Sequence, residues 1–78
     1  MTLSAADDIA VLRLDFISEC LAIAATHLQV AAACASVAEQ VGLEYSLRCA
    51  VPSLKAALQT YRELKASQPK SPADREAA

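Results

Sequence analysis

The sequence predicts an all-α protein, and three observations carry this prediction. Of the 78 residues only one is glycine and none is tryptophan, 55% are apolar, and alanine and leucine are abundant. Apolar side chains recur every three or four positions along two long segments, which is the period of an α-helix. The single glycine, Gly42, separates the two segments. Together these features indicate two helices that pair as a hairpin.

The first segment is expected to form one long helix over residues 5–41. Ser4 stands where a capping hydroxyl is favoured, and Asp7 and Asp8 fall in the first turn, where the helix dipole favours negative charge. No glycine or proline interrupts the segment. Gly42 is expected to end the helix as its C′ residue, in a left-handed conformation.

Two adjacent apolar stripes run along this first helix. The first contains Ile9, Leu12, Phe16, Cys20, Ile23, His27, Val30, Cys34, Val37 and Val41. The second contains Leu14, Ile17, Leu21, Ala24, Leu28, Ala31, Ala35 and Ala38. Because one partner helix covers only a narrow seam, the first helix is expected to be covered on two sides.

The second segment predicts a shorter helix over residues 44–66. Glu44 and Arg48 are spaced for a favourable pair one turn apart. Pro52 lies inside the segment and is expected to kink the helix without ending it, because the apolar period continues beyond it. The expected core stripe contains Leu47, Val51, Leu54, Leu58, Tyr61 and Leu64. Residues 1–66 then form the hairpin domain.

The remaining residues, 67–78, are expected to form a disordered tail. Ser, Pro, Lys, Asp and Ala dominate them, Pro69 and Pro72 are among them, and they show no apolar period.

The helix lengths predict a homodimer. At about 1.5 Å per residue, the first helix would exceed the second by roughly 20 Å and leave apolar surface uncovered. A chain of this size also builds only a marginal core by itself. The segment up to Gly42 is acidic and the segment beyond it is basic, which favours packing between the two. A second copy is therefore expected to complete a helical bundle.

The expected function is that of a small protein-interaction module without catalysis: a regulator, inhibitor, adaptor or secretion-type chaperone that works as a homodimeric bundle and binds an unidentified protein. The wide apolar face and the scarcity of polar chemistry favour it. The residues expected to bind protein are Leu14, Ile17, Leu21, Leu28, Tyr45 and Arg48. The first four belong to the second apolar stripe, which is either this binding site or the seam of the dimer. The sequence contains one histidine and shows no evident pair of a nucleophile and a base, which argues against an enzyme.

A DNA-binding regulator is the alternative function. Residues 37–43, centred on Gly42, resemble a helix-turn-helix in their small residue, glycine and flanking aliphatic residues. However, Arg48 falls where an apolar anchor is expected, and Pro52 interrupts the element that would read DNA. Because the chain also lacks a strong positive field, nucleic acid is not the expected partner.

A metal-binding bundle is the third possibility. Cys20, His27 and Cys34 share one face at intervals of seven residues, but seven residues span about 10.5 Å of helix, too far for ligands of one ion. Only a two-fold partner could bring equivalent residues together. Reduced core thiols and a bonded core histidine are expected instead, with no metal and no cofactor.

A membrane span and a secretory signal are also weighed and not expected. Residues 20–38 lack charge, but alanine dominates them and His27 and Gln29 lie among them, which favours a buried bundle helix. Asp7, Asp8 and Asp15 stand where a secretory signal would be apolar or basic. The expected location is the cytoplasm.

Overall fold

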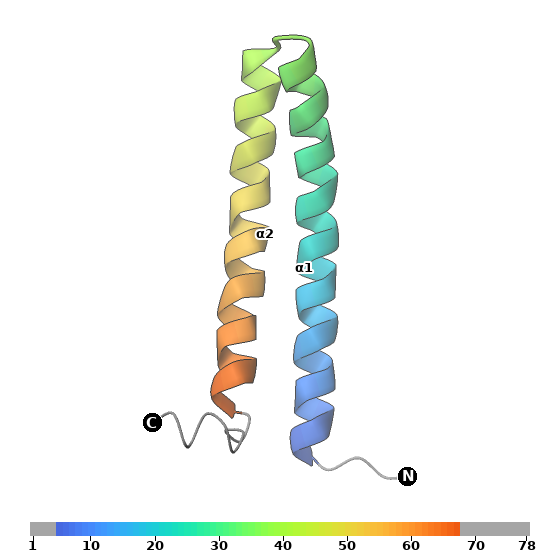
Figure 1. Cartoon of the computed structure of the whole chain (residues 1–78), viewed down its shortest axis with the longest axis vertical. Coiled ribbons are helices and arrows are strands. Elements are labelled where there is room, and N and C mark those ends of the chain that lie inside the picture. Colours follow the sequence, from blue (N-terminus) through green and yellow to red (C-terminus); the bar gives the residue numbers. More distant parts are fainter. Residues whose placement is uncertain (1–4, 68–78) are drawn as a thin grey trace, which may run out of the picture.

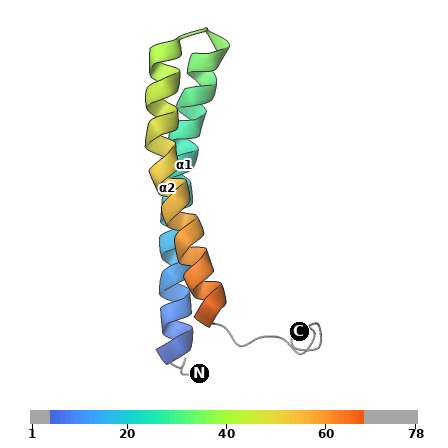
Figure 2. The ribbon, with the colours of Figure 1, turned by 90° about the vertical axis from the view of Figure 1, so that its left-hand side faces the viewer.

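The described part of the chain forms two antiparallel helices. The structure, a computed structural model, describes residues 5–67. Helix α1 spans Ala5–Ser36 and helix α2 spans Gln40–Ser67. The two helices lie side by side along their lengths (Figure 1), and the view at right angles shows the same pairing (Figure 2). The prediction of an all-helical hairpin is confirmed.

The first turn of α1 contains Asp7 and Asp8, as predicted. Ser4, the predicted cap, lies outside the described residues. The predicted disordered tail also lies outside them, except for Ser67, which ends α2.

The turn between the helices comes before the predicted glycine. Ala38 adopts the left-handed conformation, with a φ of 57°. The Glu39 N–H donates to the Cys34 carbonyl at 2.8 Å, and the Ala38 N–H donates to the Ala35 carbonyl at 3.2 Å. These two hydrogen bonds are those of a Schellman motif with Ala38 at C′. The prediction that Gly42 is the C′ residue, and that the first helix reaches residue 41, is therefore wrong.

Gly42 lies instead in the first turn of α2. Its φ is not positive, and its N–H donates to the Glu39 carboxylate, which caps the first turn of α2. A Cβ on Gly42 would collide with the Glu39 carboxylate and lie 2.7 Å from the Cys34 sulfur. The glycine thus leaves room for the Glu39 cap and for the approach of α2 to the end of α1, and its backbone conformation is one that any residue adopts.

The two helices differ little in length. With 32 and 28 residues, they are about 48 and 42 Å long. The expectation that α2 leaves roughly 20 Å of α1 uncovered is therefore wrong, and the helix lengths do not predict a homodimer. Pro52 lies inside α2, which continues from Gln40 to Ser67. The kink at Pro52 stays a prediction.

The seam between the helices consists mostly of small side chains. Seam positions alternate by three and four residues on both helices, which is the spacing of antiparallel helices that wind around each other. On α1 they are Ala10, Arg13, Ile17, Cys20, Ala24, His27, Ala31 and Cys34; on α2 they are Leu43, Ser46, Ala50, Ser53, Ala57, Thr60 and Leu64. All are buried or half-buried. Leu64 is the largest of the buried ones.

Most large apolar side chains lie outside this seam. Tyr61, which was expected in the core, is 50% exposed. Leu47, Val51, Leu54 and Leu58 of the same predicted stripe are also exposed, so the prediction of a core stripe on the second helix holds for Leu64 alone. The physical reason is that small residues let the two backbones approach closely, and the hairpin packs on them.

Candidate protein-interaction surface

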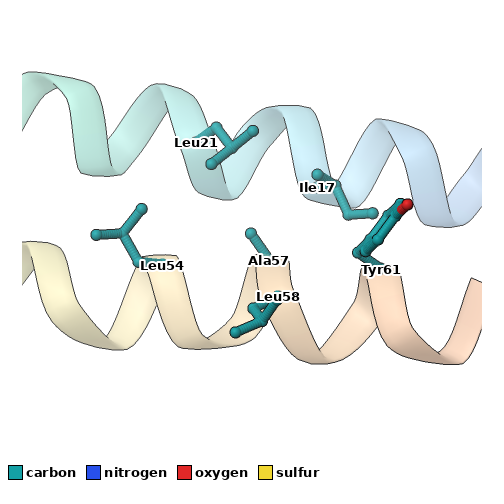
Figure 3. A pocket seen from close by; sticks show the side chains of 6 residues that line it. All are labelled: Ile17, Leu21, Leu54, Ala57, Leu58 and Tyr61. Atoms are coloured by element: carbon teal, nitrogen blue, oxygen red, sulfur yellow. The ribbon is translucent and has the colours of Figure 1, made fainter.

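An apolar groove lies between the two helices on one side of the seam. Its volume is about 460 Å³. The residues that line it are Ile17 and Leu21 of α1 and Leu54, Ala57, Leu58 and Tyr61 of α2 (Figure 3). The Tyr61 ring extends from α2 towards Ile17.

The groove is the centre of a longer apolar surface. Leu14, Leu21 and Leu28 repeat every seven residues, as the seam does, so they stay on one side of it along α1. Leu47, Leu54 and Tyr61 repeat in the same way along α2. Because Leu21 and Leu54 line the same groove, the two rows share one side of the hairpin. We call this surface the groove face: Leu14, Ile17, Leu21, Leu28, Leu47, Val51, Leu54, Leu58 and Tyr61.

The other side of the seam carries a second apolar row, from α1 alone. It repeats every seven residues and its members are exposed: Ile9, Phe16, Ile23 and Val30. We call it the α1 ridge. The neighbouring side of α2 carries small half-buried residues, Gly42, Cys49 and Ala56. The α1 ridge is therefore narrower than the groove face, to which both helices contribute.

The structure brings together some of the residues expected to bind protein. Leu14, Leu21 and Leu28 are exposed on the groove face, and half-buried Ile17 lines the groove. Tyr45 and Arg48 are exposed near the turn and do not line the groove.

Sequence reasoning missed the α2 half of the groove face. Leu54, Leu58 and Tyr61 were placed in the core because they follow a helical period. The signal that could have identified them as surface residues is the row of small residues beside them, Ala50, Ser53, Ala57 and Thr60, at the spacing of a seam.

Charged side chains border the groove face along the outer edges of both helices. Arg48, Lys55 and Arg62 repeat every seven residues on α2 and are exposed. Arg48 forms the predicted pair with Glu44, at 2.8 Å. Asp8 and Asp15 occupy the corresponding edge of α1. The groove face therefore has an acidic edge and a basic edge.

Cys20, His27 and Cys34 lie in the seam of their own hairpin. Cys20 is buried, and His27 and Cys34 are half-buried. Among residues 5–67 no group of three or more histidine, cysteine, aspartate or glutamate side chains is placed to hold a metal ion. All three cysteines are free thiols, with Cys49 half-buried like Cys34.

The segment around Gly42 joins antiparallel helices. A helix-turn-helix instead sets its helices at about 90–120°, with the second free to enter a groove of DNA. In this part of the chain the start of α2 lies beside the end of α1 (Figure 1), where Cys34, Gly42 and Leu43 are half-buried.

Neither α1 nor α2 is long and apolar enough to span a bilayer. Comparison of the chain with protein families, with curated proteins and with solved structures finds no match.

Proposed function

We propose that this chain is a protein-interaction module that acts as a homodimer through its groove face and has no catalytic role. One observation carries the proposal: the hairpin buries small residues and exposes large apolar ones. Leu21, Leu54 and Leu58 are each at least 40% exposed, while Ala24 and Ala50 are 1% exposed. A contiguous apolar surface of this kind marks an interaction site in a soluble protein.

Burial of the groove face would contribute free energy to association. Eight of its nine residues are exposed, and burying the exposed half of such a side chain contributes about 1 kcal/mol. Two copies would then gain on the order of 15 kcal/mol. Losing translational and rotational freedom costs roughly 4–15 kcal/mol. The estimated gain matches the upper limit of this cost and exceeds the rest of the range, so apolar burial favours a pair of hairpins.

The groove face also fits a second hairpin in shape. Its rows run from Leu14 to Leu28 on α1 and from Leu47 to Tyr61 on α2, so it is two helices wide and about 25 Å long, or roughly 500 Å². A standard interface buries about 800 Å² on each partner, so residues that flank the groove face would be buried as well. Two such faces packed together form a four-helix bundle, in which the large residues become the core.

The unidentified protein partner is expected at surfaces that this dimer leaves exposed, with Tyr45 and Arg48 among the contacts. Aromatic and arginine side chains are the usual anchors of protein interfaces. Free thiols are typical of a reducing compartment, which supports a cytoplasmic location.

Molar mass by light scattering after size exclusion tests the dimer. The wild-type chain should elute as a dimer at micromolar concentration, and Leu21→Asp should elute as a monomer because it places two charges in the interface. Leu12→Asp is the matched control, since Leu12 is 67% exposed on α1 away from the groove face and its substitution should leave the dimer intact.

A wild-type monomer that unfolds cooperatively would overturn the homodimer. Dissociation by Leu12→Asp but not by Leu21→Asp would move the interface to the other side of α1. Salt-sensitive retention on DNA that is lost in Arg48→Glu would favour the DNA-binding alternative.

A further inference from the structure

We infer that the two copies pack groove face to groove face with both turns at the same end of the bundle, so that α1 of each chain lies against α2 of the other. This arrangement rests on the proposed homodimer. It adds which helices meet, and therefore which surface of the dimer contains residues from both copies.

A two-fold axis can relate two such hairpins in two ways. If the axis runs along the helices, α1 faces the partner's α2 and the two turns lie at the same end. If the axis runs across the helices, α1 faces the partner's α1, α2 faces the partner's α2, and the turns lie at opposite ends. Both arrangements bury the same apolar groove, so apolar burial alone does not choose between them.

The charged edges of the groove face distinguish the two arrangements. Ile17 lies level with Tyr61 across the seam (Figure 3), so Asp15 of α1 lies at about the height of Arg62 of α2. Rotation about an axis along the helices preserves height. It therefore places the acidic edge of one copy, at Asp15, against the basic edge of the other, at Arg62.

The opposite-end arrangement places like charges together. It brings the α2 edge of one copy against the same edge of the other in reversed order. Arg48 is paired with Glu44 of its own helix, so the like-charge contacts come from Lys55 and Arg62. Lys55 then meets its own equivalent near the middle of the bundle. Like charges across an interface are unfavourable and opposite charges fix its register, so the charge pattern selects the same-end arrangement.

The same-end arrangement creates a surface that one chain lacks. Val37, Val41 and Tyr45 are exposed at or next to the turn, and Val41 is 78% exposed. With both turns together, these residues of two copies form one apolar tip at a single end of the bundle. A docked protein would then contact both copies there, and its site would be incomplete on a monomer.

The distance between Val41 of one copy and Val41 of the other tests the arrangement directly. Val41→Cys, in a chain with Cys20, Cys34 and Cys49 replaced by alanine, carries one nitroxide label per copy. Pulsed electron paramagnetic resonance should give a separation below about 30 Å, because equivalent helices of one bundle lie within about 15 Å of each other. The opposite-end arrangement predicts about 40 Å or more, the length of α2. Circular dichroism and light scattering establish that the labelled chain is folded and dimeric.

Charge reversal tests the same inference in the native-cysteine chain. Arg62→Asp should weaken the dimer on the order of tenfold, since it sets two carboxylates against each other at both symmetric contacts. Asp15→Arg should do the same, and the double variant should restore the wild-type dissociation constant. Glu19→Lys, an exposed residue of α1 away from this edge, is the control and should change it less than twofold.

Each result has a single meaning. A distance of about 40 Å or more between the two labels in a chain that remains dimeric would overturn the arrangement but not the homodimer. A tighter dimer in Arg62→Asp would do the same. A monomeric wild-type chain would overturn the homodimer itself. A short separation with rescue in the double variant supports both.

Discussion

Replacing Ala38 by glycine should stabilise the hairpin. Ala38 has a φ of 57°, and a left-handed conformation costs a residue with a Cβ about 1–2 kcal/mol. Glycine avoids this cost but loses about 0.5–1 kcal/mol through the greater freedom of the unfolded chain. The difference is a gain of about 0.5–1 kcal/mol per chain. For a domain of this size it should raise the melting temperature by about 4 °C.

Urea unfolding followed by circular dichroism measures this gain. Variants must be compared at one protein concentration, because association itself adds stability. Ala22→Gly is the matched control: Ala22 is exposed inside α1, where glycine should cost about 1 kcal/mol. If Ala38→Gly lowers the free energy of unfolding as much as Ala22→Gly does, the left-handed residue of the turn is not Ala38.

Three further substitutions test the seam and the cap by the same measurement. Ala24→Leu should lower the free energy of unfolding by about 1–3 kcal/mol because it overfills a buried seam position. Ala22→Leu, on the exposed side of α1, should change it by less than about 0.5 kcal/mol. Equal effects would show that α1 faces α2 through other residues. Leu64→Ala should cost about 2–4 kcal/mol, and an unchanged stability would place Leu64 outside the core. Glu39→Ala should cost about 1 kcal/mol through loss of the α2 cap, and a neutral result would contradict the hydrogen bond to the Gly42 N–H.

The helices could be predicted from the sequence because their signals are local. The three-and-four spacing and the scarcity of glycine and proline act within a few turns of one helix. The turn was misplaced because two uses of glycine compete. A lone glycine after a helical segment usually provides a left-handed C′ residue, but Gly42 leaves room for the Glu39 cap and the Cys34 side chain, and Ala38 takes the left-handed conformation.

The candidate site could be predicted only in part. The α1 half of the groove face, including Leu14, Leu21 and Leu28, was assigned to a partner because the apolar face of the first helix is wider than one seam. The α2 half was missed because Leu54 and Tyr61 follow the period of a core stripe. Periodicity identifies apolar rows, whereas side-chain size decides which row lies between two close helices, and that comparison requires both helices at once.

The seam of small residues has a consequence for the life of the protein in the cell. α1 and α2 contact each other mainly through methyl groups, thiols and hydroxyls, and each of these groups contributes about 1 kcal/mol or less to the free energy of unfolding. A newly made chain without a partner is therefore expected to open often and to present its unfolded backbone to proteases, which degrade opened chains. Assembly stabilises the folded hairpin and so makes opening less frequent. The cellular level of this protein is then expected to follow the supply of binding partners, with unassembled copies degraded first.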